Sequence, residues 1–333
     1  MITTENNRSR RGILENILGA VGDTPLVRLT NIAPKNGIAI YVKPEFLNPG
    51  GSIKDRMALY IIEKAEREGR LKPGGTIVEN TSGNTGVGLA IIAAVKGYRT
   101  IFTIPDKMSA DKINMLKAFG AEVVVTPTDV PADSPQSYYS VARKIAAETP
   151  NSLYVNQYHT PDNIEAHYCL TGPEIFRQSG GKIDYFVAGI GTGGTLSGAG
   201  KYLKEKIPGL KVIAVDPVGS IYYDHFKHGK LIQPQVYKVE GIGEDMLAEA
   251  MDFSVVDDII QVNDRDCFLT ARELTRREGL FAGGSSGGAV WASLKLAGSL
   301  KAPATIVTIL PDSGNRYLSK IYNDDWMKAN GFL

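Results

Sequence analysis

The hydrophobic positions of the chain alternate between the period of a strand and the period of a helix. Short apolar runs closed by Gly, Pro or charged residues predict strands at residues 38–42, 76–79, 98–104, 121–126, 153–156, 185–188, 211–216 and 305–310. Apolar residues at helical spacing predict helices at residues 13–18, 57–68, 87–96, 109–119, 139–148, 197–206, 264–278 and 286–297. The repeated strand–helix order predicts an α/β fold in which parallel-rich sheets carry helices on both faces.

Two positions, near Asn48 and near His159, divide this pattern into lobes. We predict a smaller lobe at residues 48–159 and a larger lobe at residues 12–47 and 160–333. Residues 1–11 are polar and basic without an apolar segment, so we expect a flexible arm there rather than a secretory signal. Clefts tend to form where two lobes meet, and the junction is therefore the first place to look for a functional site.

The composition favours a globular protein that binds a small molecule. Hydrophobic residues make up 43% of the chain, and 37 basic residues nearly balance 36 acidic ones. A net charge of +1 gives no field that would attract nucleic acid or an anionic membrane, and no apolar run is long enough to span a bilayer. Cys169 and Cys267 form no zinc or disulfide pattern, and the four histidines show no metal-binding spacing. We expect a soluble, cytoplasmic protein without a metal.

The segment at residues 48–56 places a lysine where covalent chemistry is possible. Two glycines precede Ser52, which could cap a helix beginning at Ile53. Lys54 would then lie in the first helical turn, where the positive end of the helix dipole and the nearby Arg56 disfavour an ammonium group. A neutral amine is a nucleophile. Most lysines at such positions are solvated surface charges, so this segment alone leaves both interpretations open.

A glycine-rich segment follows the strand predicted at residues 185–188. Residues 188–195 place several backbone N–H groups near the start of a helix, an arrangement suited to a phosphate group. Gly189, Gly191 and Gly194 also form a GxGxxG pattern, and Asp216 ends a strand about twenty residues later, as in dinucleotide-binding folds. An NAD-binding oxidoreductase is therefore an alternative from a different class, and a catalytically silent binding protein is another.

Two further polar loops also precede predicted helices. Residues 81–86 supply hydroxyls, an amide and helix-terminal N–H groups that could bind a carboxylate, or they could simply cap the helix. Residues 283–288 could likewise be a compact helix cap. Parallel sheets bring such strand-to-helix loops to one edge. An aldehyde cofactor that carries a phosphate would use all these loops and Lys54, whereas an NAD enzyme has no evident use for Lys54 or residues 81–86.

The order of these motifs resembles that of the fold-type II pyridoxal-phosphate enzymes, in the group of cystathionine β-synthases and cysteine synthases. The motifs are Ser52-Ile53-Lys54-Asp55-Arg56, Thr81-Ser82-Gly83-Asn84-Thr85-Gly86, Gly191-Thr192-Gly193-Gly194-Thr195 and Gly283-Gly284-Ser285-Ser286-Gly287. The resemblance covers nearly the whole chain and is greatest to the catalytic core of the cystathionine β-synthases. It implies a two-lobed architecture like that of the tryptophan synthase β-subunit, in which the larger lobe binds the cofactor, the smaller mobile lobe binds the substrate, and the protein is a homodimer.

The resemblance implies a role for each candidate site residue. Lys54 would hold pyridoxal 5'-phosphate as a Schiff base and later move protons. The other residues expected to bind the cofactor are Asn84 at the 3'-oxygen, Gly191, Thr192, Gly193, Gly194 and Thr195 at the phosphate, Ser285 at the pyridine nitrogen, and Asp312. The residues expected to bind the substrates are Thr81, Ser82, Gly83, Thr85, Gln157, Gly241 and Glu244.

The reaction implied by the resemblance is a β-replacement, in which serine or an activated serine loses its β-substituent and a thiol adds. We expect cystathionine to form from serine and homocysteine, with cysteine synthesis from O-acetylserine and sulfide as the alternative. Glu244 stands where the cystathionine synthases generally carry Tyr. It could bind the amine of homocysteine, indicate a different nucleophile, or be a solvated loop charge. No haem is expected, because the N-terminal Cys and His that ligate it in animal enzymes are missing.

Overall fold

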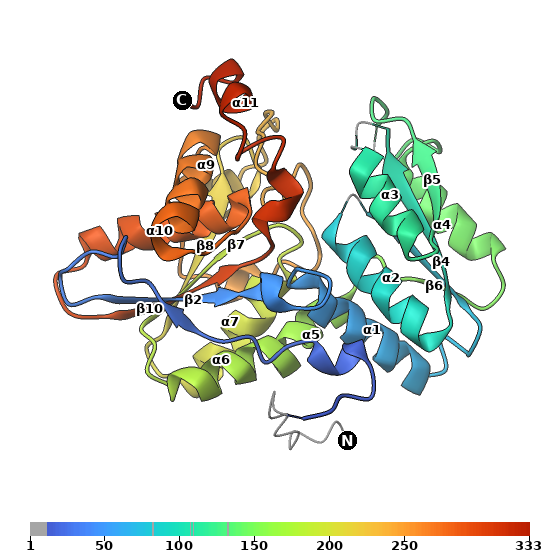
Figure 1. Ribbon diagram of the computed structural model, residues 1–333, viewed down its shortest axis with the longest axis horizontal. Helices are drawn as coiled ribbons and strands as arrows, with labels where there is room; N and C mark the ends of the chain where they lie inside the picture. The colour runs from blue at the N-terminus through green and yellow to red at the C-terminus, as the bar shows by residue number, and fades with distance from the viewer. Residues whose placement is uncertain (1–11, 82, 107, 109, 132) are drawn as a thin grey trace.

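The computed structural model describes residues 12–81, 83–106, 108, 110–131 and 133–333, and it contains two separate β-sheets (Figure 1). The larger sheet has six strands in the order β1-β2-β10-β7-β8-β9, and the smaller has four in the order β5-β4-β3-β6. Every pair of neighbouring strands is parallel except β1 and β2. This confirms the predicted α/β fold with parallel-rich sheets. The arm predicted at residues 1–11 and Ser82 lie outside the described residues.

The larger sheet is buried on both faces. Its strands are β1 (Val27–Arg28), β2 (Ala39–Pro44), β7 (Tyr185–Gly189), β8 (Lys211–Pro217), β9 (Asp258–Val262) and β10 (Thr305–Leu310). Side chains alternate along each strand, so Val187 packs into one hydrophobic cluster while Phe186 and Ala188 pack into another. The first cluster also holds residues of α9 (Asp264–Glu273), α10 (Gly284–Ser299) and α11 (Asp324–Ala329). The second holds residues of α6 (Gly172–Ser179), α7 (Gly194–Lys206) and α8 (Tyr222–His228).

In the smaller sheet, side chains also alternate along each strand between two hydrophobic clusters. Its strands are β3 (Thr76–Asn80), β4 (Arg99–Pro105), β5 (Glu122–Thr126) and β6 (Ser152–Tyr154). Ile77 packs with residues of α1 (Lys54–Arg67), α2 (Asn84–Lys96) and α3 (Ala110–Ala118), whereas its neighbour Val78 packs against α4 (Tyr138–Glu148). Helix α5 (Pro161–Ala166) contacts both α1 and α7, and thus joins the helices of the two sheets (Figure 1). The lobe boundaries near residues 48 and 159 stay predictions.

Several elements differ from the sequence-based expectation. The helix expected at residues 13–18 is only the short 3-10 turn η1 (Ile17–Ala20). Helices α2 and α7 begin three residues earlier than predicted, because the polar loops run directly into them. The pattern missed β1, β9, α5, α6, α8 and α11, whose runs of two to eight residues are too short to show a clear period. The remaining turns are the 3-10 segments η2 (Glu45–Leu47), η4 (Phe253–Val255) and η6 (Gly314–Tyr317) and the π-helical segments η3 (His167–Thr171) and η5 (Leu274–Glu278).

The parallel strands bring the polar loops to one side of each sheet. The loops after β3, β7 and β10 all leave from carboxyl ends, and Ser52 pairs with Asp312 in an isolated β-bridge beside the start of α1. Within the described part of the chain, no helix has both the length and the apolar character needed to cross a membrane. The fold therefore gathers the polar loops predicted from the sequence at the region between the two sheets.

Candidate active site

A pocket of about 570 Å³ opens between the two sheets. This volume is within the usual range of small-molecule sites. Ten of the candidate residues line it, namely Lys54, Thr81, Gly83, Asn84, Thr85, Gln157, Gly191, Thr192, Gly241 and Glu244. They come from the start of α1, the start of α2, the loop after β6, the loop after β7 and a loop at residues 239–244. Residues up to 190 positions apart in the sequence thus share one cavity.

Other candidate residues lie directly behind this lining. Asp312 accepts a hydrogen bond from Asn84, with 2.8 Å between Nδ2 and Oδ2. Thr195 lies 3.2 Å from His167, measured between Oγ1 and Nε2. Ser285 is buried in the first turn of α10, next to Gly241. Gly193 and Gly194 form the start of α7.

Lys54 is the first residue of α1 and is held near the pocket wall by its surroundings. Its backbone N–H donates to Ser52 Oγ at 3.2 Å, so the serine supports the helix start even though Ile53 occupies the cap position. The Lys54 ammonium is 3.4 Å from Thr192 Oγ1. Burial lowers the pKa of this amine to about 8, while the charges of Glu244 and Glu79 partly oppose the shift. Roughly a tenth of the amine is therefore neutral and nucleophilic at pH 7, far more than for an ordinary lysine.

Two acids face this lysine from different elements. Glu79 on β3 is fully buried, and burial raises its pKa to about 8 despite hydrogen bonds from the backbone N–H groups of Gln157 and Asn156. Glu244 has its pKa raised to about 8 by burial and by the neighbouring charge of Asp245. Glu244 lines the pocket and is partly buried, so it is not a solvated loop charge.

The glycine loop before α7 forms a narrow cradle. A Cβ atom at Gly191 would lie 2.7 Å from the carbonyl oxygen of Gly241, and one at Gly193 would lie 2.5 Å from the Cα of Met251. Gly193 also has a φ of +88°, in the left-handed region that favours glycine. Because α7 begins at Gly194, the N–H groups of its first turn have no acceptors within the helix. Those N–H groups and the helix dipole suit a phosphate group.

The loop before α2 is organised by two threonine hydroxyls. Thr81 Oγ1 accepts from the backbone N–H groups of Gly83 at 3.3 Å and Gly86 at 3.2 Å. Thr85 Oγ1 donates to Gln157 Oε1 at 2.7 Å, which connects this loop to the segment after β6. The amide nitrogen of Gln157 is thereby turned away from Thr85 and donates to Glu79, and its second hydrogen can serve as a donor to a substrate carboxylate.

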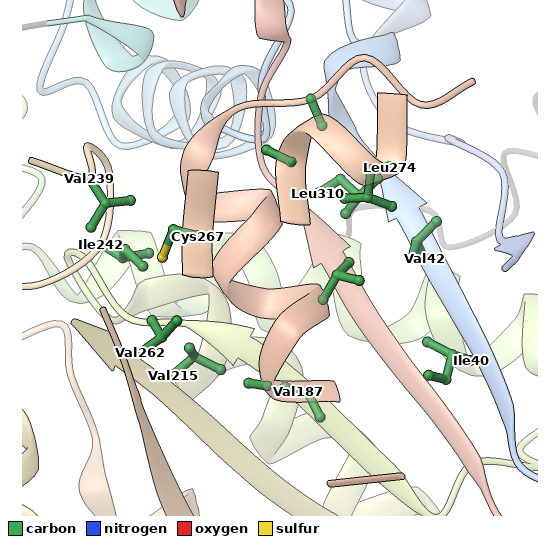
Figure 2. Close-up of a cluster of buried hydrophobic side chains, with 14 of the residues drawn as sticks. Ile40, Val42, Val187, Val215, Val239, Ile242, Val262, Cys267, Leu274 and Leu310 are labelled. Atoms are coloured by element: carbon green, nitrogen blue, oxygen red, sulfur yellow. The ribbon is translucent and has the colours of Figure 1, made fainter. Parts of the chain in front are cut away.

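The loop that carries Gly241 and Glu244 is anchored in the core of the larger sheet. Val239 and Ile242 are buried, and Figure 2 shows both side chains beside Cys267 of α9. Their burial fixes a loop that has no regular secondary structure. Gly241 and Glu244 therefore have a defined position at the pocket, although only sequence motifs and not periodicity pointed to them.

The residues around the pocket fit pyridoxal phosphate. Asn84 Oδ1, Asn163 Oδ1 and Asp312 Oδ1 are buried without a hydrogen-bond partner among the described residues, as expected of a site built around a ligand. A helix N-terminus is present for a phosphate and a partly neutral amine for an aldehyde. In contrast, the described residues contain no cluster of three or more His, Cys, Asp or Glu side chains that could hold a metal ion.

A family model described as "Pyridoxal-phosphate dependent enzyme" matches residues 17–312. The chain belongs to this family. The cofactor of the family is pyridoxal 5'-phosphate, which agrees with the site geometry and replaces the NAD interpretation of the glycine loop. Asp216, the acidic residue of that interpretation, is fully buried and accepts from the backbone N–H of Tyr223 at 2.9 Å.

Individual relatives share the chain's sequence over most of its length. Cystathionine beta-synthase from Apis mellifera is 50% identical over 325 residues, which are 96% of this chain and 64% of that protein. Cysteine synthase from Staphylococcus aureus strain Mu50 is 43% identical over 307 residues, or 92% of this chain and 96% of that protein. The crystal structure of an O-ureido-L-serine synthase superposes with a TM-score of 0.86 at 34% identity, covering 95% of this chain and 100% of its own. The chain spans 64% of the length of the cystathionine β-synthase from Apis mellifera and 57% of that from Rattus norvegicus, less than two thirds of each.

The structure adds residues that the sequence patterns did not single out. They are Glu79, Tyr158, Asn163 and His167. Of these, only Glu79 carries a sequence signal, since a charged residue inside an otherwise apolar strand is rarely buried without a function or a partner. The others become visible only when the two sheets are assembled.

Proposed function

We propose that this chain catalyses a pyridoxal-phosphate-dependent β-replacement on serine or an activated serine, with a thiol as the incoming group. The observation that carries the proposal is the meeting of three groups in one pocket: the amine of Lys54, the loop at residues 81–85 with Gln157, and the glycine cradle before α7. A covalent amine, a carboxylate site and a phosphate site are what an amino-acid substrate on this cofactor requires.

The cofactor would be held by residues of both sheets. Gly191, Thr192, Gly193, Gly194 and Thr195 would bind the phosphate at the start of α7, Asn84 the 3'-oxygen with Asp312 behind it, and Ser285 the ring nitrogen. Bound there, pyridoxal phosphate supplies the electron sink that makes the α-proton of an amino acid acidic. The hydroxyl of Ser285 cannot hold a proton on the ring nitrogen as a carboxylate would, which favours β-elimination over transamination.

Lys54 would move the proton. Its pKa of about 8 lets the free amine take the α-proton of the substrate as a general base near neutral pH. Thr81, Gly83, Thr85 and Gln157 would orient the substrate carboxylate, which fixes the α-hydrogen relative to the amine. Lys54 can then return the proton after the new bond at the β-carbon has formed.

For the incoming thiol we favour homocysteine over sulfide, because Glu244 places a carboxyl group in the pocket beside Gly241. The ammonium group of an amino-acid thiol would lower the raised pKa of Glu244 and bind its carboxylate form, and sulfide has no such group. The identity with cystathionine β-synthases supports the same choice. Cysteine synthesis is the second candidate, favoured by the relative from Staphylococcus aureus, whose length this chain covers almost completely.

Separate assays with serine plus homocysteine and with O-acetylserine plus sulfide test this choice. We expect the purified protein, loaded with pyridoxal phosphate, to have the higher kcat/KM with the first pair. A large advantage for O-acetylserine and sulfide would favour the cysteine synthase activity instead. Absence of turnover with either pair by a protein that binds the cofactor would contradict β-replacement with thiols.

The role of Glu244 is tested by Glu244→Gln, which keeps the size of the side chain and removes its charge. If the carboxylate binds the ammonium of homocysteine, kcat/KM for homocysteine should fall about tenfold or more, in keeping with the loss of a charge-assisted hydrogen bond. The rate with sulfide should change by less than about twofold. Glu249→Gln, at an exposed acid in the same loop region, is the control. An equal decrease in rate with homocysteine and with sulfide would show that Glu244 does not recognise the thiol substrate.

A further inference from the structure

Asn163 connects the two halves of the proposed site without being one of the residues assigned to it. It lies on α5 and is fully buried. Its side-chain nitrogen Nδ2 donates to the carbonyl oxygen of Gln157 at 2.9 Å and to Thr192 Oγ1 at 3.0 Å. Gln157 follows the smaller sheet and Thr192 follows β7 of the larger sheet, so a single amide group contacts both.

The direction of these hydrogen bonds is set by chemistry. A carbonyl oxygen only accepts, so the Asn163 atom facing Gln157 must be the nitrogen. The same nitrogen can only donate to Thr192, whose oxygen is also within 3.4 Å of the Lys54 ammonium. With donors on its oxygen, the Thr192 hydroxyl keeps its own hydrogen for another acceptor. Thr192 lines the pocket, so that hydrogen is available to an anion bound there.

The contact with Gln157 completes a clamp on one peptide segment. Glu79 accepts from the backbone N–H of Asn156 at 2.6 Å and from that of Gln157 at 3.4 Å. Asn163 holds the carbonyl of Gln157 from the other side. Asn156 has a φ of +51°, a conformation that a non-glycine residue keeps only when its surroundings hold it there. The clamp therefore sets the position from which the Gln157 side chain reaches Thr85 and the pocket.

We propose that Asn163 is a positioning residue that orients the Thr192 hydroxyl as a donor to the cofactor phosphate and, through Gln157, fixes the substrate side of the site. The proposal rests on the proposed function for the assignments of Thr192 and Gln157. Cofactor binding and amino-acid binding are then coupled through one buried amide. Removing that amide should weaken both, although it touches neither ligand.

The test is a double-mutant cycle between Asn163→Leu and Thr192→Val, read as the affinity of the apoprotein for pyridoxal phosphate in an absorbance titration. Both substitutions keep the approximate shape of the side chain and remove the hydrogen bond. Asn163→Leu should weaken cofactor binding about tenfold or more, because it removes the orienting donor. In the Thr192→Val background the same substitution should weaken cofactor binding by less than about threefold.

A matched control is Asp162→Asn. Asp162 is the neighbouring residue on α5 and bonds to Lys64 and Arg70, away from Thr192 and Gln157. Its substitution perturbs the same helix and should leave the cofactor affinity unchanged. Phosphorus NMR of the bound cofactor gives a second readout, and the phosphate signal should shift in Asn163→Leu but not in Asp162→Asn. If Asn163→Leu does not fold, Asn163→Asp keeps the size and replaces the donor with an acceptor, with the same expected direction.

Two results would overturn the proposal. One is an unchanged cofactor affinity in a folded Asn163 variant. The other is an equal loss in the wild-type and Thr192→Val backgrounds, which would mean that Asn163 does not act through Thr192. Neither result depends on turnover, so a failure of β-replacement with serine and thiols would be seen separately, as a protein that binds the cofactor in the predicted way without the expected reaction.

Discussion

Two buried clusters of ionisable residues lie at the first turn of α1, and they differ in what determines the pKa values of their members. Arg56 belongs to a cluster with Lys43, Glu45 and Glu174, which we call the paired cluster, and its ion pairs are 2.6 Å long to Glu45 and 2.8 Å long to Glu174. Lys54, two residues earlier, belongs with Glu79 and Glu244 to what we call the pocket cluster. Among the described carboxylates, none forms an ion pair with Lys54.

The pKa values express this difference. In the paired cluster, burial alone would raise the pKa of Glu174, but the hydrogen bond and charge of Arg56 lower it to about 2. In the pocket cluster, burial dominates and moves the pKa of Lys54 down and those of Glu79 and Glu244 up, all to about 8. The carboxylates and the guanidinium of the paired cluster are thus stabilised as charges, whereas the groups of the pocket cluster titrate near neutral pH, as proton transfer at the proposed site would require.

The largest expected effect that separates the clusters is that of Lys54→Ala. Activity should fall by at least about 10²–10⁴-fold, since the general base and the covalent attachment are lost together. The visible absorbance of the lysine-bound cofactor should disappear, whereas the free energy of unfolding of the apoprotein should not decrease, because no ion pair is broken. Lys238→Ala, at another pocket lysine, should keep the absorbance band. A Lys54→Ala protein that retained the band would refute the assignment.

Arg56→Met, in contrast to Lys54→Ala, should lower the free energy of unfolding. Removing the guanidinium leaves Glu45 and Glu174 buried with one fewer partner, which is expected to lower the free energy of unfolding by about 3–5 kcal/mol. Urea unfolding of the apoprotein measures this. Arg177→Met is the matched control, because its ion pair with Asp23 is largely exposed and should contribute no more than about 1 kcal/mol. Similar losses in the two variants would mean that the paired cluster contributes little to stability.

The smallest and most specific expected effect is on the pH dependence of stability. The folded protein keeps a proton on Glu79 up to about pH 8, whereas a carboxyl with the ordinary pKa of 4.5 releases it earlier. The folded state binds more protons between these values, so Glu79 makes the free energy of unfolding fall as pH rises, by up to about 1.4 kcal/mol per pH unit. Glu174 acts in the other direction, between its pKa of about 2 and 4.5, where its contribution grows with pH.

Glu79→Gln tests this by removing the titration. Urea unfolding between about pH 5 and pH 8 should show a less steep decrease of stability with pH in the variant than in the wild type. Glu148→Gln, at an exposed acid, should reproduce the wild-type slope. A variant slope equal to that of the wild type would show that Glu79 titrates normally in the folded protein.

Much of the fold could be predicted from the sequence because it depends on local patterns. The runs at residues 185–188 and 305–310 became β7 and β10 with nearly the predicted bounds, since continuous apolar runs are typical of parallel strands buried on both faces. The two-residue strand β1 was missed because its pairing with β2, and not its own composition, makes it a strand. The edge strand β9 was missed although its two Ile and one Val residues favour a strand, because the run has only five residues.

The residues of the site also divide into those that have a local sequence signal and those that have none. Lys54 and the polar loops could be found because glycines, hydroxyls and a lysine next to helix starts have local chemical signatures. Asn163 could not, since nothing in its sequence neighbourhood indicates that its amide will reach both Gln157 and Thr192. Its contacts join segments that come together only when α5 packs against α1 and α7.

By itself, the sequence determined the type of chemistry: the residue types for an amine, a phosphate cradle and a carboxylate site, each next to a predicted helix. Only the tertiary structure decided their electrostatic state. A lysine and an arginine two positions apart in α1 face opposite sides of the helix start, and one is desolvated in a pocket while the other is neutralised by Glu45 and Glu174. The physical reason is that a pKa depends on the solvent and charges that surround a group in space, which the order of residues along the chain does not specify.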